Sequence, residues 1–141
     1  MCIRDSYKPE LPLNLTKYLF KFANSSIDVS DGLIDDLAKM INRQSLSFHL
    51  FENKIPVSNK LGNLIKKQRL NKINVISNGD DYQVLFTADI KKARIIQKAS
   101  KTTGIKITKI GKIVSGKDRS FIFDEKGKQI RAKSKGYIHR F

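Results

Sequence analysis

This chain of 141 residues is poor in cysteine, tryptophan and acidic residues. Cys2 is its one cysteine, so no disulfide can form within the chain, which is typical of the reducing cytoplasm. No apolar run approaches the roughly 20 residues that a membrane-spanning helix needs. The N-terminus also lacks the apolar core of a signal peptide. We therefore expect a cytoplasmic protein that has no membrane partner.

The scarcity of acids leaves a formal net charge of +15, from 28 basic and 13 acidic residues. A basic nucleic-acid-binding module is one interpretation, and it predicts binding that weakens steeply with salt. A general lysine bias is the other, since lysines outnumber arginines 21 to 7. The lysines are scattered and are not interleaved with aromatic residues that could stack on bases. We therefore predict no nucleic-acid partner and keep the binding module as the alternative.

Hydrophobic residues make up 40% of the chain, enough for one domain with a core. Their spacing predicts helices over 15–23, from near Asp31 to Ile41, over 59–68 and over 90–103. It predicts strands over 25–29, 46–50, 82–87, 105–113, 120–123 and 129–132. The mixture indicates an α/β or α+β class with a mixed sheet covered by helices. Residues 1–6 show no periodicity, and we interpret them as a disordered or non-native tail.

One stretch, NSSIDVSDGLIDDL, concentrates acids in this basic chain. Its four aspartates fall within nine residues: Asp28, Asp31, Asp35 and Asp36. The predicted strand ends and the helix begins inside the stretch, which presents side chains and free N–H groups together. Carboxylates repel phosphate but can bind Mg²⁺ that carries phosphate, and Ser30 can donate to a phosphate oxygen. The plainer alternative is that Asp28 or Ser30 caps the helix, while Asp35 and Asp36 are solvated surface residues.

Asp80 and Asp81 stand on a glycine-containing turn just before a predicted strand. They suit a metal or a cationic ligand, or they form an ordinary Asx turn. Near the C-terminus, Tyr137 suits stacking on an aromatic ligand or anchoring of the tail. The two histidines, His49 and His139, have no metal-ligand spacing, so we interpret them as structural. Neither a Walker A loop nor a serine–histidine–aspartate arrangement is present.

Three separated stretches resemble thiamine-monophosphate kinases, and they occur in that family's order. The first is ANSSIDVSDGL at 23–33. The second, NGDDYQVLFT at 78–87, is similar to the family's GGEDYELLFT, and the closing KGYIHRF at 135–141 is similar to its KGYxHF. The short IPVS stretch at 55–58 also matches. Several motifs that agree in order are far more specific than any one of them.

The resemblance implies a fold similar to that of aminoimidazole-ribonucleotide synthetase, with two α/β domains and a homodimer. Residues 7–141 look like the C-terminal domain alone. The N-terminal ATP-binding domain is then missing, and we expect the isolated fragment to be inactive. Another enzyme of the same ATP-dependent superfamily, such as selenophosphate synthetase or a hydrogenase-maturation protein, is the enzymatic alternative.

The family resemblance further implies transfer of the γ-phosphoryl group of ATP to thiamine phosphate, giving thiamine diphosphate. Matched by position, Asp28 and Asp31 look like Mg²⁺ ligands and Ser30 looks like an ATP contact. Asp80 takes the place of a substrate-binding glutamate that is one methylene longer, and Tyr137 that of a substrate-binding tyrosine. An acid and a tyrosine suit the cationic, aromatic thiazolium ring. No side chain is predicted to be catalytic, since phosphoryl transfer asks mainly for positioning and charge neutralisation.

Overall fold

The computed structural model describes residues 13–41, 44–77 and 83–131. Its helices are α2 (Leu13–Phe22), α3 (Leu33–Met40), η1 (Glu52–Lys54), α4 (Asn59–Gln68), α5 (Lys72–Ile76), η2 (Ile90–Lys92) and α6 (Ala93–Thr103). Its strands are β1 (Ala23–Val29), β2 (Leu46–Phe51), β3 (Gln83–Ala88), β4 (Gly111–Ser115), β5 (Phe121–Phe123) and β6 (Gln129–Arg131). No helix in these ranges is long and apolar enough to cross a membrane.

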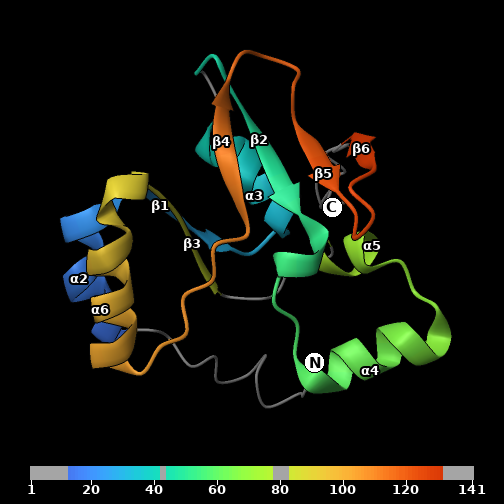
Figure 1. The fold of residues 1–141 in the computed structure, drawn as a ribbon, viewed down its shortest axis with the longest axis horizontal. Coiled ribbons are helices and arrows are strands. Elements are labelled where there is room, and N and C mark those ends of the chain that lie inside the picture. The colour runs from blue at the N-terminus through green and yellow to red at the C-terminus, as the bar shows by residue number, and fades with distance from the viewer. Residues whose placement is uncertain (1–12, 42–43, 78–82, 132–141) are drawn as a thin grey trace, which may run out of the picture.

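The strands form two sheets (Figure 1). β1 and β3 pair antiparallel, with Asp28 opposite Val84 and Val29 opposite Gln83. The larger sheet has the order β4-β2-β5-β6 and is mixed, because β2 runs parallel to β5 and antiparallel to β4. The predicted α/β class with a mixed, helix-covered sheet is therefore confirmed, and a separate two-stranded sheet accompanies it.

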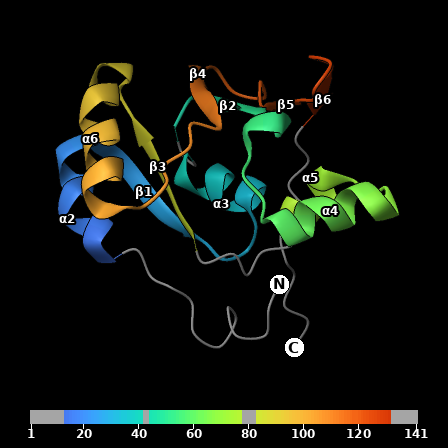
Figure 2. The same cartoon turned by 60° about the horizontal axis from the view of Figure 1, so that its bottom comes forward.

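The two-stranded sheet separates two hydrophobic cores. Leu85 of β3 packs on the larger core, and its neighbour Phe86 packs on the smaller one. This follows from the alternation of side chains along a strand. The smaller core lies among α2, α6 and the strand pair, where the ring of Phe22 is 5.2 Å from that of Phe86. Figure 2 shows the strand pair between these two helices and α3.

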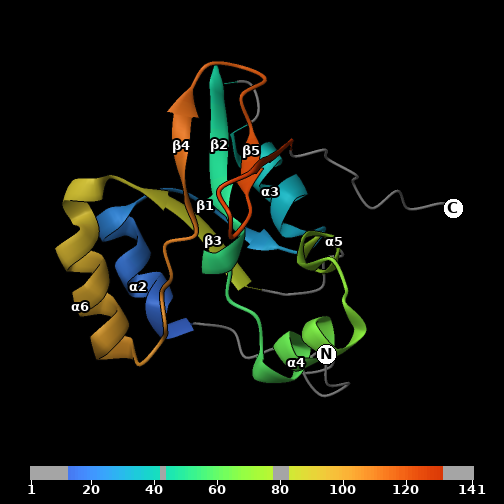
Figure 3. The ribbon, with the colours of Figure 1, turned by 45° about the vertical axis from the view of Figure 1, so that its right-hand side comes forward.

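The larger core joins α3 to the four-stranded sheet. One face of α3 buries Leu33, Ile34 and Leu37, at the spacing predicted from the sequence. This face packs with Phe48 and Leu50 of β2 and with Ile122 of β5, which is 1% exposed. Figure 3 shows α3 beside β2 and β5, with α4 set apart from this sheet. The end of β1 and the start of α3 are therefore fixed by one core.

Two segments differ from the sequence predictions. The strand predicted over 105–113 is confirmed only from Gly111, because Ile105 and Ile107 pack against the smaller core instead of joining the sheet. The short helix α5, capped by Asn71, was not predicted. In contrast, Gly104 ends α6 in the left-handed conformation, as its position after the apolar pattern predicts.

Candidate phosphate and metal site

The candidate site is the loop of residues 30–32 between β1 and α3. A single carboxylate oxygen organises its backbone. Oδ2 of Asp36 accepts hydrogen bonds from the N–H groups of Ser30 at 2.9 Å, Asp31 at 3.0 Å and Gly32 at 3.2 Å. Three successive donors that would otherwise need water or a ligand therefore point at one side chain from the first turn of α3.

The interpretation of Asp35 and Asp36 as solvated surface residues is wrong. Their exposed fractions are 4% and 1%. A buried carboxylate is tolerated only where hydrogen bonds or an opposite charge compensate for lost water. Asp36 has both, since Lys39 Nζ also donates to its Oδ1 at 2.9 Å. An acid four residues after a glycine that precedes a helix was the available signal, because such a side chain can reach back to the loop.

Hydrogen bonding and charge shift two pKa values in this cluster. Burial acts to raise the pKa of Asp36, but hydrogen bonds from Lys39 and from the N–H groups of Asp31 and Ser30 outweigh it and lower the pKa. Hydrogen bonds to Asp31 and then to Asp36 raise the pKa of Lys39. Asp36 is therefore ionised and Lys39 protonated throughout the neutral range.

Asp31 is the other partner of the Lys39 ammonium, through its Oδ2. Unlike Asp36, its side chain is 38% exposed, and that of Lys39 is 50% exposed. Asp28 lies three residues earlier on β1 and is exposed, because alternation places it on the face opposite buried Val29. The structure thus brings Asp28 and Asp31 to the same end of β1, and both reach solvent.

At Gly32, the loop lies close to residues that flank the second motif. It has φ +125°, and a Cβ atom built there would lie 2.5 Å from the carbonyl oxygen of Ser77. On the other side of the loop, Val29 pairs with Gln83. Ser77 and Gln83 directly flank residues 78–82 in the sequence. Ser77 and the strand that begins at Gln83, nearly 50 residues further along the chain, therefore lie next to this loop at the end of the strand pair.

Two predicted substrate-binding residues lie outside the described residues: Asp80 and Tyr137. Ser30 is described and is partly exposed. Its backbone N–H is engaged by Asp36, so its hydroxyl is the group it offers to a ligand. His49, predicted to be structural, lies in β2 with its ring 5.3 Å from that of Phe123.

The donor set suits Mg²⁺ bound together with phosphate. Residues 13–41, 44–77 and 83–131 contain no group of three or more acidic, histidine or cysteine side chains that could hold a metal ion alone. Mg²⁺ commonly uses only one or two protein carboxylates and completes its shell with water and phosphate oxygens. The ammonium of Lys39 on Asp31 shows that this carboxylate already holds a cation.

Curated proteins similar to this chain are thiamine-monophosphate kinases. That of Buchnera aphidicola from Acyrthosiphon pisum is 35% identical over 122 residues, which cover 86% of this chain and 37% of the relative. That of Buchnera aphidicola from Schizaphis graminum is 33% identical over 138 residues, covering 97% of this chain and 42% of the relative. The chain thus spans about two fifths of these relatives' length. No protein-family model matches it.

Solved structures agree with the sequence comparison. AaThiL complexed with AMPPCP and TMP superposes with a TM-score of 0.73 and 29% identity, covering 98% of this chain and 40% of that one. The hydrogenase maturation protein HypE of E. coli has a TM-score of 0.68 at 14% identity, covering 84% of this chain and 37% of that one.

The fold is therefore the aminoimidazole-ribonucleotide-synthetase-like α/β fold, which the chain shares with HypE. Its site is an acidic loop at the junction of a strand and a helix. Within this class, the chain resembles thiamine-monophosphate kinases in both sequence and structure, as its three motifs predict.

Proposed function

We propose that this chain is part of a kinase that transfers the γ-phosphoryl group of ATP to thiamine phosphate and produces thiamine diphosphate. The observation that carries the proposal is the loop of residues 30–32, held by Asp36 in a chain that resembles thiamine-monophosphate kinases along almost all of its length. Phosphoryl transfer depends mainly on positioned charges, and such a loop presents Asp31 and the Ser30 hydroxyl from a rigid support.

In this proposal, Asp28 and Asp31 hold Mg²⁺, and Ser30 donates to a phosphate oxygen of ATP. Mg²⁺ would neutralise charge on the phosphate oxygens when bound. Asp80 and Tyr137 bind the thiazolium part of thiamine phosphate, which suits an acid beside an aromatic ring. The closeness of Ser77 and Gln83 to the loop supports a common site for both motifs.

We further propose that residues 7–141 form one C-terminal domain of a longer, cytoplasmic homodimer. An N-terminal domain would supply further ATP and metal ligands. The length of the relatives supports this, because the chain spans only 37–42% of the two described above. The chain alone is then expected to be inactive, since half of the site lies elsewhere.

A chimaera tests the proposal. This chain replaces the matching segment of one of the Buchnera kinases, and thiamine diphosphate formation from thiamine phosphate and Mg-ATP is measured by chromatography. We expect activity, which falls roughly 100-fold or more in the Asp28→Asn and Asp31→Asn variants, the usual loss when one transition-state charge contact is removed. A folded chimaera that forms no thiamine diphosphate would contradict the proposed reaction. Near-normal turnover in either variant would contradict the metal assignment.

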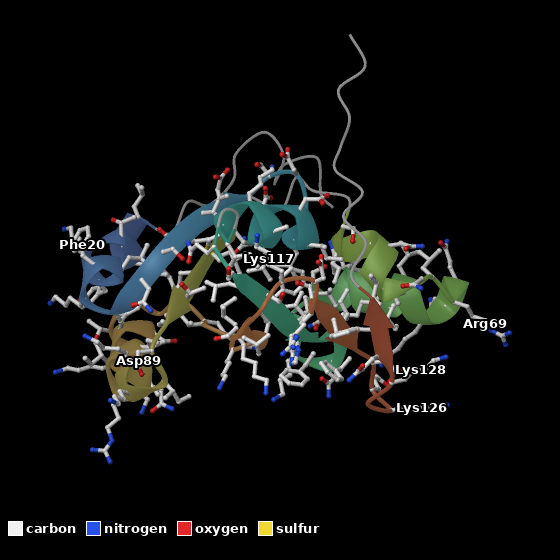
Figure 4. All side chains as sticks on the ribbon, turned by 90° about the horizontal axis from the view of Figure 1, so that it is seen from above. Phe20, Arg69, Asp89, Lys117, Lys126 and Lys128 are labelled. Carbon is white, nitrogen blue, oxygen red and sulfur yellow. The ribbon has the colours of Figure 1, made fainter. Side chains whose placement is uncertain are left out.

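Asp89→Asn provides the matched control for these variants. Its carboxylate caps η2 by accepting the N–H of Lys91 at 2.8 Å, a role that asparagine fills equally well. Asp89 follows Ala88, which pairs with Ala23 at the end of β1 opposite the loop, and Figure 4 shows Asp89 at one edge of the molecule. Because it makes the same chemical change away from the loop, Asp89→Asn should retain full turnover.

A further inference from the structure

Lys39 bridges two carboxylates whose surroundings differ. Its ammonium contacts Asp36, which is 1% exposed, and Asp31, whose side chain is 38% exposed. Both contacts come from one flexible side chain on the exposed face of α3. The same cation therefore belongs to a buried pair and to a solvent-exposed pair at once.

The two contacts should differ in how readily they exchange. An exposed ion pair is weak, because water and salt screen it and because both side chains lose freedom. A buried carboxylate that loses its partner instead leaves an uncompensated charge in the interior. A competing cation would therefore take Asp31 from Lys39 more easily than it would take Asp36.

Asp36 also keeps the loop in place when that exchange occurs. Its Oδ2 holds the three backbone N–H groups of residues 30–32, while its separate oxygen, Oδ1, meets Lys39. Release of Asp31 from Lys39 therefore requires no change in the backbone of the loop. The side chain of Asp31 can turn to a new cation on a fixed support.

We propose that Lys39 is the resident counter-ion of Asp31, and that a divalent metal ion displaces it while Asp36 retains both Lys39 and the loop. This inference rests on the proposed function, because it takes Asp31 as a metal ligand. Lys39 then lowers metal affinity in two ways. It competes for Asp31, and it remains close to the bound metal as a like charge.

This role can be separated from a purely structural one by the sign of an effect. If Lys39 only stabilises the loop, its removal makes the side chain of Asp31 less ordered and weakens metal binding. If Lys39 competes with the metal, its removal strengthens metal binding. The three N–H hydrogen bonds to Asp36 do not involve Lys39, so the loop keeps its main support when Lys39 is replaced.

The test titrates Mn²⁺ into the full-length chimaera described above, in which the ligands of the N-terminal domain are present, and follows free Mn²⁺ by electron paramagnetic resonance without turnover. Lys39→Met keeps the length of the stem and removes the charge, and Lys39→Arg is the matched control that keeps the charge. We expect Lys39→Met to lower the Kd roughly 3- to 10-fold, the scale of a weak ion pair plus a nearby like charge. Lys39→Arg should stay near the wild type, Asp31→Asn should raise the Kd, and Mg²⁺ should compete.

An unchanged or raised Kd in Lys39→Met would overturn the proposal, and so would the absence of Mn²⁺ binding in every variant. Lys39→Gln repeats the measurement with a neutral polar side chain, should the methionine variant not fold. The readout needs no phosphoryl transfer. A chimaera that forms no thiamine diphosphate would therefore refute the proposed reaction, whereas a Kd that does not fall would refute the displacement.

Discussion

Replacement of Gly32 by alanine is the sharpest probe of the geometry at this site. Gly32 adopts φ +125° and ψ 147°, a conformation that side chains with a Cβ atom rarely take. The added methyl group would also lie 2.5 Å from the carbonyl oxygen of Ser77, 2.9 Å from its carbonyl carbon and 3.2 Å from its Cα. All three atoms belong to the backbone, so no side-chain rotation can relieve the clash.

Two costs add in the Gly32→Ala variant. The unfavourable backbone conformation costs about 1–3 kcal/mol. Insertion of a methyl group into a tightly packed place costs about another 1–3 kcal/mol. The free energy of unfolding should therefore fall by about 4 kcal/mol, a large part of the roughly 5–15 kcal/mol that stabilises a typical domain.

Gly104→Ala is the matched control for this prediction. Gly104 also has a positive φ, +70°, but nothing lies within 4 Å of an added Cβ atom. Only the left-handed conformation penalises the change, by about 1–2 kcal/mol. Alanine also lowers the conformational entropy of the unfolded chain relative to glycine, which offsets part of that penalty. We therefore expect a net loss of about 1 kcal/mol, close to a quarter of the loss at Gly32.

Urea unfolding followed by circular dichroism measures both variants against the wild type. The difference between the two alanine variants reports the contact with Ser77 together with the costlier backbone conformation of Gly32, since Gly104 lies in the left-handed region and has no neighbour within 4 Å of an added Cβ atom. Gly32→Ala should also weaken Mn²⁺ binding, since Gly32 adjoins Asp31. Equal stabilities of the two variants would refute the close approach of the loop to Ser77.

Two further predictions concern buried polar groups. Asp36 has a lowered pKa in the folded chain, so its contribution to stability is present above the unfolded value of about 4 and is lost as pH falls through the folded pKa. The stability difference between wild type and Asp36→Asn, measured by urea unfolding, should therefore shrink below about pH 4; a constant difference would contradict this. Ser47, 1% exposed, donates to the carbonyl of Gly116 and accepts from the N–H of Arg119. Ser47→Ala should cost about 2 kcal/mol in the same assay, whereas the exposed control Ser115→Ala should cost almost nothing.

The fold class and most helices and strands could be predicted from the spacing of apolar residues, because in an amphipathic segment this spacing indicates which face is buried. The helix α4 matches its predicted range of 59–68, and Gly104 ends α6 as expected. Residues 105–110 could not be predicted in the same way. Alternating isoleucines indicate a strand equally well whether the segment joins a sheet or packs on a neighbouring core, and only the tertiary structure decides between them.

The candidate site was only partly predictable. Asp28, Ser30 and Asp31 were predicted as ligands from the family motif, whereas Asp35 and Asp36 were interpreted as solvated surface residues. What distinguishes Asp36 is that three N–H groups of the loop and the ammonium of Lys39 on α3 surround it, in a loop whose Gly32 lies against Ser77, far along the chain. Local patterns do not contain such long-range contacts.

The local charges explain why a chain of net charge +15 keeps acids at this loop. Asp31 and Asp36 share one ammonium, so the three groups together carry a net negative charge. The exposed Asp28 adds a second at the same end of β1. The end of β1 thus gathers negative charge in a basic chain, which attracts a divalent cation and requires that cation for an anionic phosphate to bind there.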